Sequence, residues 1–132
     1  MQFQAGYFTD EDVDNWIKKK NYPDGYIISP AINCTGKSSV ILKFQHTFRW
    51  WDYGKSDSAG LFVGVSTDKI NWQNFDVRKL VKSGTDMFTP IDEEINISTW
   101  AANKPTVYIR FYWKGLMGWY WMVDDISLSE GF

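Results

Sequence analysis

The sequence predicts an all-β fold, a two-sheet antiparallel jelly-roll sandwich, in which the whole chain of 132 residues forms one domain. Short segments in which apolar and polar residues alternate recur between turn residues, as they do in antiparallel strands. No long stretch has the apolar period of a helix, and no unit repeats at a period of about 20 to 50 residues. A chain of this length can form one core, but not a cofactor domain and a substrate domain together.

The first predicted strand covers residues 26–32, directly after a Pro-Asp-Gly turn. Pro30 has no N–H to donate within a sheet, so this strand belongs at an edge or a bulge. Residues 39–48 form the most regular strand of the first half, because Val40, Leu42 and every second residue after them share one face.

Residues 59–66 predict a further strand with apolar side chains on one face. Gly60 and Gly64 lie on the other face, on either side of Phe62, and leave room there for a close neighbour or a ligand. A strand at residues 94–97 and a loop after it lead into the last part of the chain.

The last part of the chain predicts two adjacent strands rich in aromatic residues. Residues 106–114 are apolar on one parity and mixed on the other, so one face packs and the other is free to bind. Residues 119–123 are apolar on both parities, as expected for a central strand covered on both sides. Asp124 and Asp125 then interrupt the apolar run, and two adjacent carboxylates there need a group that compensates their charge.

Composition restricts the function. Aromatic residues make up 18% of the chain, so we expect some rings to be exposed on a ligand-stacking surface or a protein interface, although an aromatic-rich core would also account for them. The net charge is −2 and the basic residues are scattered apart from the run Lys18-Lys19-Lys20, which is expected to be a solvated face, so no basic stripe favours a nucleic-acid partner. No apolar run is long enough to cross a membrane. The one cysteine, Cys34, forms no internal disulfide and is expected to be a small, semi-buried apolar residue.

Five segments, taken in order, resemble a known family: residues 26–32, 42–46, 63–68 with Trp72, 107–111 and 121–126. The pattern resembles the MAM-like jelly-roll modules of secreted Bacteroidetes proteins, a group that includes the cleaved-adhesin domains of gingipains. The resemblance covers roughly residues 26–128, and residues 1–25 match it poorly. It implies a secreted or cell-surface module beside other domains of a larger protein, with adhesion or carbohydrate binding as its role and often a structural calcium ion.

A loop at residues 49–58 is the first candidate for ligand binding, because loops expose their side chains. Sugars stack their C–H faces on Trp and Tyr rings, while Asp and Arg side chains hydrogen-bond to sugar hydroxyls. In this loop those side chains are Arg49, Trp50, Trp51, Asp52 and Tyr53. Around the turn of the last two strands, Trp113, Trp119 and Tyr120 would complete the platform if both turns reach one end of the sandwich. Rings that cover sheet edges or a neighbouring domain are the alternative.

The aspartate pair is the candidate metal site. Asp124 and Asp125 cannot both point inward from a regular strand, so one is expected to meet a cation or N–H groups and the other to face outward or sit on a bulge. Carboxylate oxygens suit Ca²⁺, and Asp57 would add a ligand if its loop folds nearby. The alternative is a carboxylate satisfied by the backbone and by Arg110.

Nothing in the sequence predicts catalysis. His46, the single histidine, lies on the apolar parity of its strand and is expected to be packed and hydrogen-bonded. No nucleophile, zinc or nucleotide motif occurs, and Glu93 and Glu94 would point to opposite faces of a strand, which does not suit paired glycosidase carboxylates.

The sequence therefore predicts a non-catalytic carbohydrate-binding or adhesion module that binds a polysaccharide or glycan on exposed Trp and Tyr rings. The alternative hypothesis is a structural or protein-protein interaction domain of a cell-surface or virion assembly.

Overall fold

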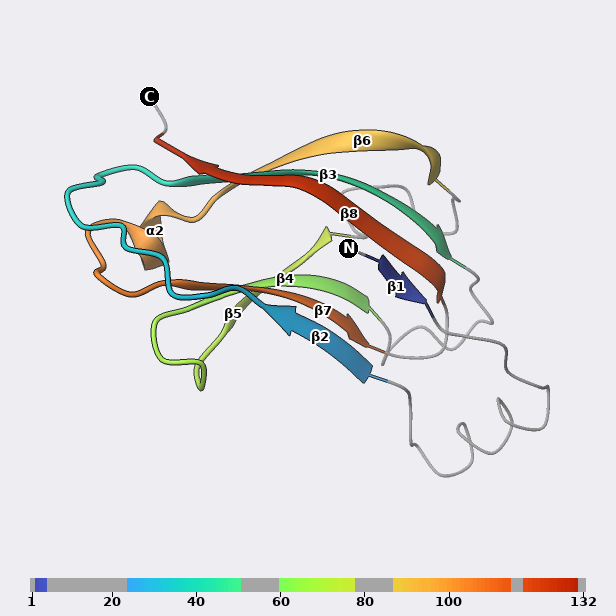
Figure 1. Cartoon of the computed structure of the whole chain (residues 1–132), viewed down its shortest axis with the longest axis horizontal. Coiled ribbons are helices and arrows are strands. Elements are labelled where there is room, and N and C mark those ends of the chain that lie inside the picture. Colours follow the sequence, from blue (N-terminus) through green and yellow to red (C-terminus); the bar gives the residue numbers. More distant parts are fainter. Residues whose placement is uncertain (1, 5–23, 51–59, 78–86, 115–117, 131–132) are drawn as a thin grey trace.

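The computed structural model describes residues 2–4, 24–50, 60–77, 87–114 and 118–130. These residues form two sheets that face each other, with one short helix at one end (Figure 1). The elements are β1 (Gln2–Gln4), β2 (Asp24–Ile28), β3 (Ile41–Trp50), β4 (Gly60–Ser66), β5 (Gln73–Asp76), β6 (Met87–Asn96), α2 (Ser98–Ala101), β7 (Tyr108–Lys114) and β8 (Gly118–Ser129). The predicted all-β sandwich of two sheets is confirmed.

One sheet has the strand order β1-β8-β3-β6 and the other has the order β2-β7-β4-β5, and the pairings are antiparallel. Most connections cross from one sheet to the other, as they do in a jelly roll. β2 is an edge strand and ends before Pro30, which agrees with the missing N–H of that residue. β8 lies inside its sheet as predicted, but Met122 on its outer face is exposed while Trp121 and Val123 on its inner face are buried.

The core lies between the two sheets and takes alternate residues from each strand. Leu61, Val63 and Val65 of β4 are buried, so the period-two pattern of the sequence sets the inner face. The ring of Phe111 in β7 lies 5.5 Å from that of Phe44 in β3 and 5.7 Å from that of Trp121 in β8, measured between ring centroids. These aromatic contacts join the two layers.

Several element boundaries differ from the sequence prediction: β2 covers Asp24–Ile28 and not residues 26–32, and β8 extends to Ser129. β6 begins at Met87 and not at residue 94, because an edge strand tolerates Pro90 and a run of acidic residues. The loop expected after it is a short helix, whose first turn is closed by hydrogen bonds from the N–H groups of Trp100 and Ala101 to the Ile97 carbonyl. β3 continues to Trp50, since β8 pairs with it up to that residue.

Candidate functional site

The outer face of the β2-β7-β4-β5 sheet carries an aligned row of aromatic side chains. Tyr26 in β2 is paired with Tyr112 in β7, which is paired with Phe62 in β4. Directly paired residues of antiparallel strands share one face, so the three rings lie side by side across three strands. Tyr112 lies 6.3 Å from Tyr26 and 6.3 Å from Phe62, measured between ring centroids. The Tyr26 side chain is 60% exposed, so this row reaches solvent.

Arg110 occupies the next row of the same face. It is paired with Gly64 in β4, and Gly64 is paired with Asn74 in β5. The guanidinium carbon lies 4.2 Å from the ring centre of Trp72 and 4.8 Å from that of Tyr112, within the range of cation–π contacts. The Arg110 Nη2 donates a hydrogen bond of 3.1 Å to Asn74 Oδ1, and partial burial lowers the pKa of the guanidinium from its usual value.

Gly64 is required where Trp72 and Arg110 meet. A Cβ at this position would lie 2.9 Å from Asn74 Oδ1, 3.0 Å from the ring carbon Cε3 of Trp72 and 3.5 Å from Arg110 Nε. The sequence predicted that this glycine leaves room for a close neighbour, and that prediction is confirmed. Because Gly64 has no side chain, the Trp72 indole can pack against the sheet beside the Arg110 guanidinium.

A second cation lies at the end of this face. Lys69 Nζ stands 4.6 Å from the ring centre of Tyr108, and a tight turn after β4 holds it there. Asp68 fixes that turn, because one of its carboxylate oxygens accepts hydrogen bonds of 2.8 Å from the backbone N–H groups of Ile70 and Asn71. These bonds stabilise the charged carboxylate and hold the pKa of Asp68 well below its usual range.

We call this set the aromatic–arginine face: Tyr26, Phe62, Trp72, Tyr108, Arg110 and Tyr112. It combines flat apolar rings with a hydrogen-bonding cation, and sugar recognition uses both. Two features of the sequence indicate this face: the mixed parity of residues 106–114, which includes Tyr108, Arg110 and Tyr112, and the glycines around Phe62.

The loop and turn residues predicted for ligand binding have different outcomes. Trp51, Asp52 and Tyr53 lie outside the described residues. Arg49 and Trp50 belong to β3 and not to a loop, and their backbones pair with Tyr120 and Gly118 of β8. Residues 49–50 and 118–120 therefore come together at one end of the β1-β8-β3-β6 sheet, in the layer opposite the aromatic–arginine face. The Tyr120 side chain there is half-buried.

Trp113 does not present its ring to a ligand, and that expectation was wrong. Its side chain is only 4% exposed. The reason is the alternation of β7 itself, because Trp113 shares the inward parity of Ile109 and Phe111. Trp119 lies in β8 next to the half-buried Tyr120.

The aspartate pair sits on a β-bulge, as the sequence allowed. Between Lys43 and Gln45 of β3 the facing positions on β8 move from Ser127 to Asp124, which leaves an extra residue on β8. Asp125 has a φ of 51°, and its N–H donates a 2.8 Å hydrogen bond to Asp124 Oδ1.

Both aspartates are exposed, and the described residues contain no group of three His, Cys, Asp or Glu side chains that could hold a metal ion. Calcium binds six to eight oxygens, so Asp124 and Asp125 alone offer too few. Asp57, the third predicted ligand, lies outside the described residues. The calcium site stays a prediction.

His46 is packed and hydrogen-bonded in the core, as predicted. Its Nδ1 accepts a 3.0 Å hydrogen bond from the indole Nε1 of Trp121, and its Nε2 lies 3.3 Å from Glu93 Oε1. Glu93 faces Phe44 across the sheet and so points inward, while Glu94 points outward to Lys43. The two glutamates thus lie on opposite faces.

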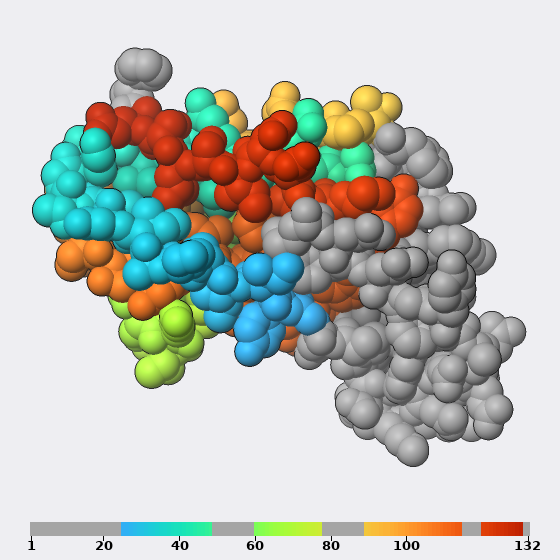
Figure 2. Space-filling model, viewed as in Figure 1, coloured from blue at the N-terminus to red at the C-terminus, as the bar shows by residue number. Residues whose placement is uncertain are grey.

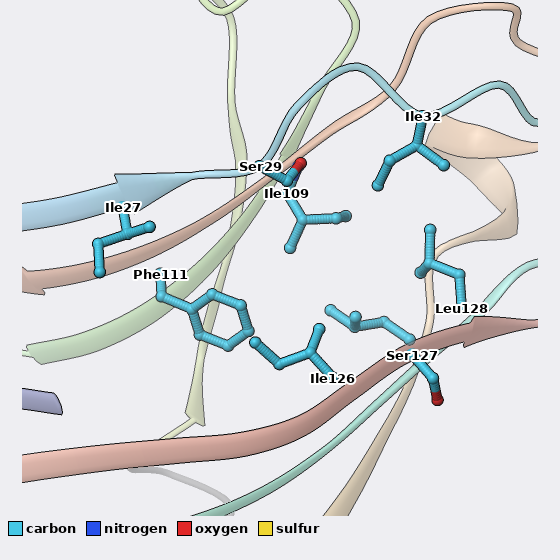
Figure 3. A pocket seen from close by; sticks show the side chains of 9 residues that line it. Ile27, Ser29, Ile32, Ile109, Phe111, Ile126, Ser127 and Leu128 are labelled. Atoms are coloured by element: carbon cyan, nitrogen blue, oxygen red, sulfur yellow. The ribbon is translucent and has the colours of Figure 1, made fainter. Parts of the chain in front are cut away.

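An apolar groove lies between β2, an edge strand of one sheet, and the part of β8 beyond its pairing with β1 in the other sheet. Both strands are visible on the face of the molecule drawn in Figure 2. It has a volume of about 320 Å³, and Ile27 and Phe111 line it from one sheet while Ile126 and Leu128 line it from the other (Figure 3). Ile27 and Ile126 are 44% and 47% exposed. The groove therefore connects the exposed Ile27 and Ile126 side chains with the buried Phe111 ring.

No helix in the described ranges is long and apolar enough to cross a membrane. Comparison of the sequence with models of protein families found no match, and comparison with curated proteins found none either.

Proposed function

We propose that this chain is a non-catalytic carbohydrate-binding or adhesion module that stacks glycan rings on the aromatic–arginine face. The observation that carries the proposal is the row Tyr26, Tyr112 and Phe62, which crosses three adjacent strands on an outer sheet face. Neighbouring strands lie about 4.8 Å apart, so three such rings extend over about two sugar units. A β-sheet also holds its side chains rigidly, which reduces the entropy lost on binding.

The experiment is a glycan array followed by affinity electrophoresis with the glycan that is retained. Tyr26→Ala should weaken binding about tenfold or more, since an aromatic anchor of a binding surface contributes more than about 1 kcal/mol. Met122→Ala is the matched control, because Met122 is an exposed apolar residue on the outer face of the other sheet. Equal losses in the two variants, or no glycan retained at all, would contradict the proposal.

The residues predicted from the sequence form a second candidate surface for the same function. Trp51→Ala removes a ring from that surface and leaves the aromatic–arginine face intact. If Trp51→Ala weakens binding and Tyr26→Ala does not, the glycan binds at the residues predicted from the sequence and not on the aromatic–arginine face.

The proposal includes a secreted or cell-surface location beside other domains, as the resemblance to MAM-like modules implies, and a structural calcium ion. Asp124 and Asp125 would hold the ion together with Asp57. If they do, EDTA should lower the melting temperature of the wild type, calcium should restore it, and Asp124→Asn should abolish both effects. An identical melting curve with EDTA and with calcium would remove calcium from the proposal.

The apolar groove favours a second candidate function, a protein-protein interaction domain. Exposed Ile27 and Ile126 beside an open core are typical of a surface that another chain covers. Sedimentation over a range of concentrations should then show association, and Ile126→Glu should abolish it. If the protein is a monomer at every concentration and retains glycans, the interaction-domain function is contradicted and only the carbohydrate-binding proposal remains.

A further inference from the structure

Arg110 lies near the middle of the aromatic–arginine face, and no acidic side chain pairs with it within the described residues. The ion pairs of the described residues involve Lys37, Lys43 and His46, and none involves Arg110. Its one hydrogen bond goes to the neutral amide of Asn74, and its Nε–H is buried with no acceptor. A guanidinium has five N–H donors, so most of its hydrogen-bonding capacity is not used within this part of the chain.

Two carboxylates of the described residues, those of Asp68 and Asp76, lie on or near this face and form no ion pair with Arg110. Asp68 is held by the turn that follows β4, where Ser66, Ile70 and Asn71 donate to it. Asp76 lies in the row of the aromatic rings, paired with Phe62 and not with the row of Arg110. Contact with the Trp72 and Tyr112 rings compensates only part of the charge, since a cation–π contact contributes about 0.5 to 2 kcal/mol.

A half-buried cation with free planar N–H groups favours an anionic ligand. The fork of the guanidinium matches a carboxylate or a sulfate, and such charge-assisted bonds are about twice as strong as neutral ones. Lys69 adds a second positive charge on the same face, over Tyr108. Because the whole chain has a net charge of −2, an anionic polymer would be attracted by this local arrangement and not by the protein as a whole.

We infer that the glycan bound on this face is anionic, with a carboxylate or sulfate group that pairs with Arg110 while the neighbouring rings stack on the sugar. This inference rests on the proposed function and names the ligand class of the same site. It makes Arg110 the specificity residue of the face.

The experiment compares matched polysaccharides in affinity electrophoresis: polygalacturonate against its carboxyl-reduced form, and dextran sulfate against dextran. At least one anionic member should be retained about tenfold more strongly than its neutral counterpart, and added salt should weaken the retention. The two pairs also distinguish a carboxylate ligand from a sulfate ligand. Equal retention within both pairs would overturn the inference and leave the proposed function intact. No retention of these four polymers and of any glycan on the array would overturn both.

Three variants assign the anion preference to Arg110. Arg110→Gln should reduce it about tenfold, and Arg110→Lys should restore it in part, because the charge returns without the planar fork. Lys104→Gln removes the same charge from an exposed position outside the face and should leave the preference unchanged. If Lys104→Gln and Arg110→Gln reduce it equally, the effect is one of overall charge and the inference fails. The matched polymers test the wild type, so the inference stays falsifiable if Arg110→Gln does not fold.

Discussion

His46 is held in its neutral form by what its two ring nitrogens contact. The indole N–H of Trp121 donates to Nδ1, so the proton of the neutral ring lies on Nε2, which faces Glu93. A second proton on Nδ1 would break the bond to the indole. Burial lowers the pKa of His46 from its usual value, and the hydrogen bond to Glu93 opposes that shift without reversing it.

This environment predicts a loss of stability in mild acid. The pKa of His46 is lower in the folded than in the unfolded state, so the unfolded state binds more protons once the pH falls below about 6.5. The free energy of unfolding should therefore fall from pH 7.5 to pH 5.5, as measured by urea denaturation. His46→Gln should flatten this dependence. Equal or greater stability of the wild type at pH 5.5 would contradict the assignment.

Gly64 provides a second test at the residue scale. Gly64→Ala would force the Trp72 ring and the Asn74 amide to move, because the new Cβ lies within 3.0 Å of both. We expect a loss of about 1 to 3 kcal/mol in the free energy of unfolding, as for an overpacked site, together with weaker glycan binding. Urea denaturation measures the first effect and affinity electrophoresis the second. Unchanged binding would mean that the Trp72 and Arg110 arrangement is not part of the site.

At the scale of elements, strands with clean alternation could be predicted from the sequence and edge strands could not. In β3, β4 and β7, the alternate apolar residues of the sequence are the ones that are buried between the sheets. β6 was predicted too short, because Pro90 and its acidic neighbours weaken the pattern where only one side of the strand is paired. A bulge at the aspartate pair was one of two alternatives, because adjacent residues of a regular strand cannot both point inward, and its backbone geometry is visible only in the structure.

The β8 bulge predicts how Asp125 tolerates substitution. Its φ of 51° lies in the left-handed region, which Asp tolerates, glycine adopts freely and β-branched residues avoid. Asp125→Gly should leave the free energy of unfolding unchanged within about 0.5 kcal/mol, while Asp125→Val should lower it by about 1 to 2 kcal/mol. Chemical denaturation measures both values. A valine variant as stable as the glycine variant would show that the bulge does not form in solution.

At the scale of the whole molecule, the two-sheet sandwich can be predicted from the sequence, but the pairing register between distant strands cannot. Tyr26 and Phe62 are separated in the sequence, and only the register of β2, β7 and β4 places their rings beside Tyr112. The sequence therefore predicts the site in the aromatic loop at residues 49–58, where the rings are adjacent in the chain. Local periodicity does not supply register, because pairing depends on all strands at once.

The shared core predicts that both sheets unfold together. Phe111 of β7 contacts Phe44 and Trp121 of the opposite sheet, so neither layer retains its packing alone. Tryptophan fluorescence and far-ultraviolet circular dichroism should give one coincident transition. Phe111→Ala should lower the free energy of unfolding by about 3 to 5 kcal/mol. Two separate transitions would show that the sheets are independent.

The inward Glu93 has a consequence for how copies of this protein behave when crowded. β6 is the outer margin of its sheet, and the side chain of Glu93 is only 12% exposed there, beside His46. A second polypeptide that paired with the free edge of β6 would remove the remaining solvent exposure of the Glu93 carboxylate and would bring no positive charge to compensate it. An inward charge on a terminal strand is one way in which proteins resist cross-β stacking. Densely packed neighbours would thus remain separate on this side and would not grow into fibrils.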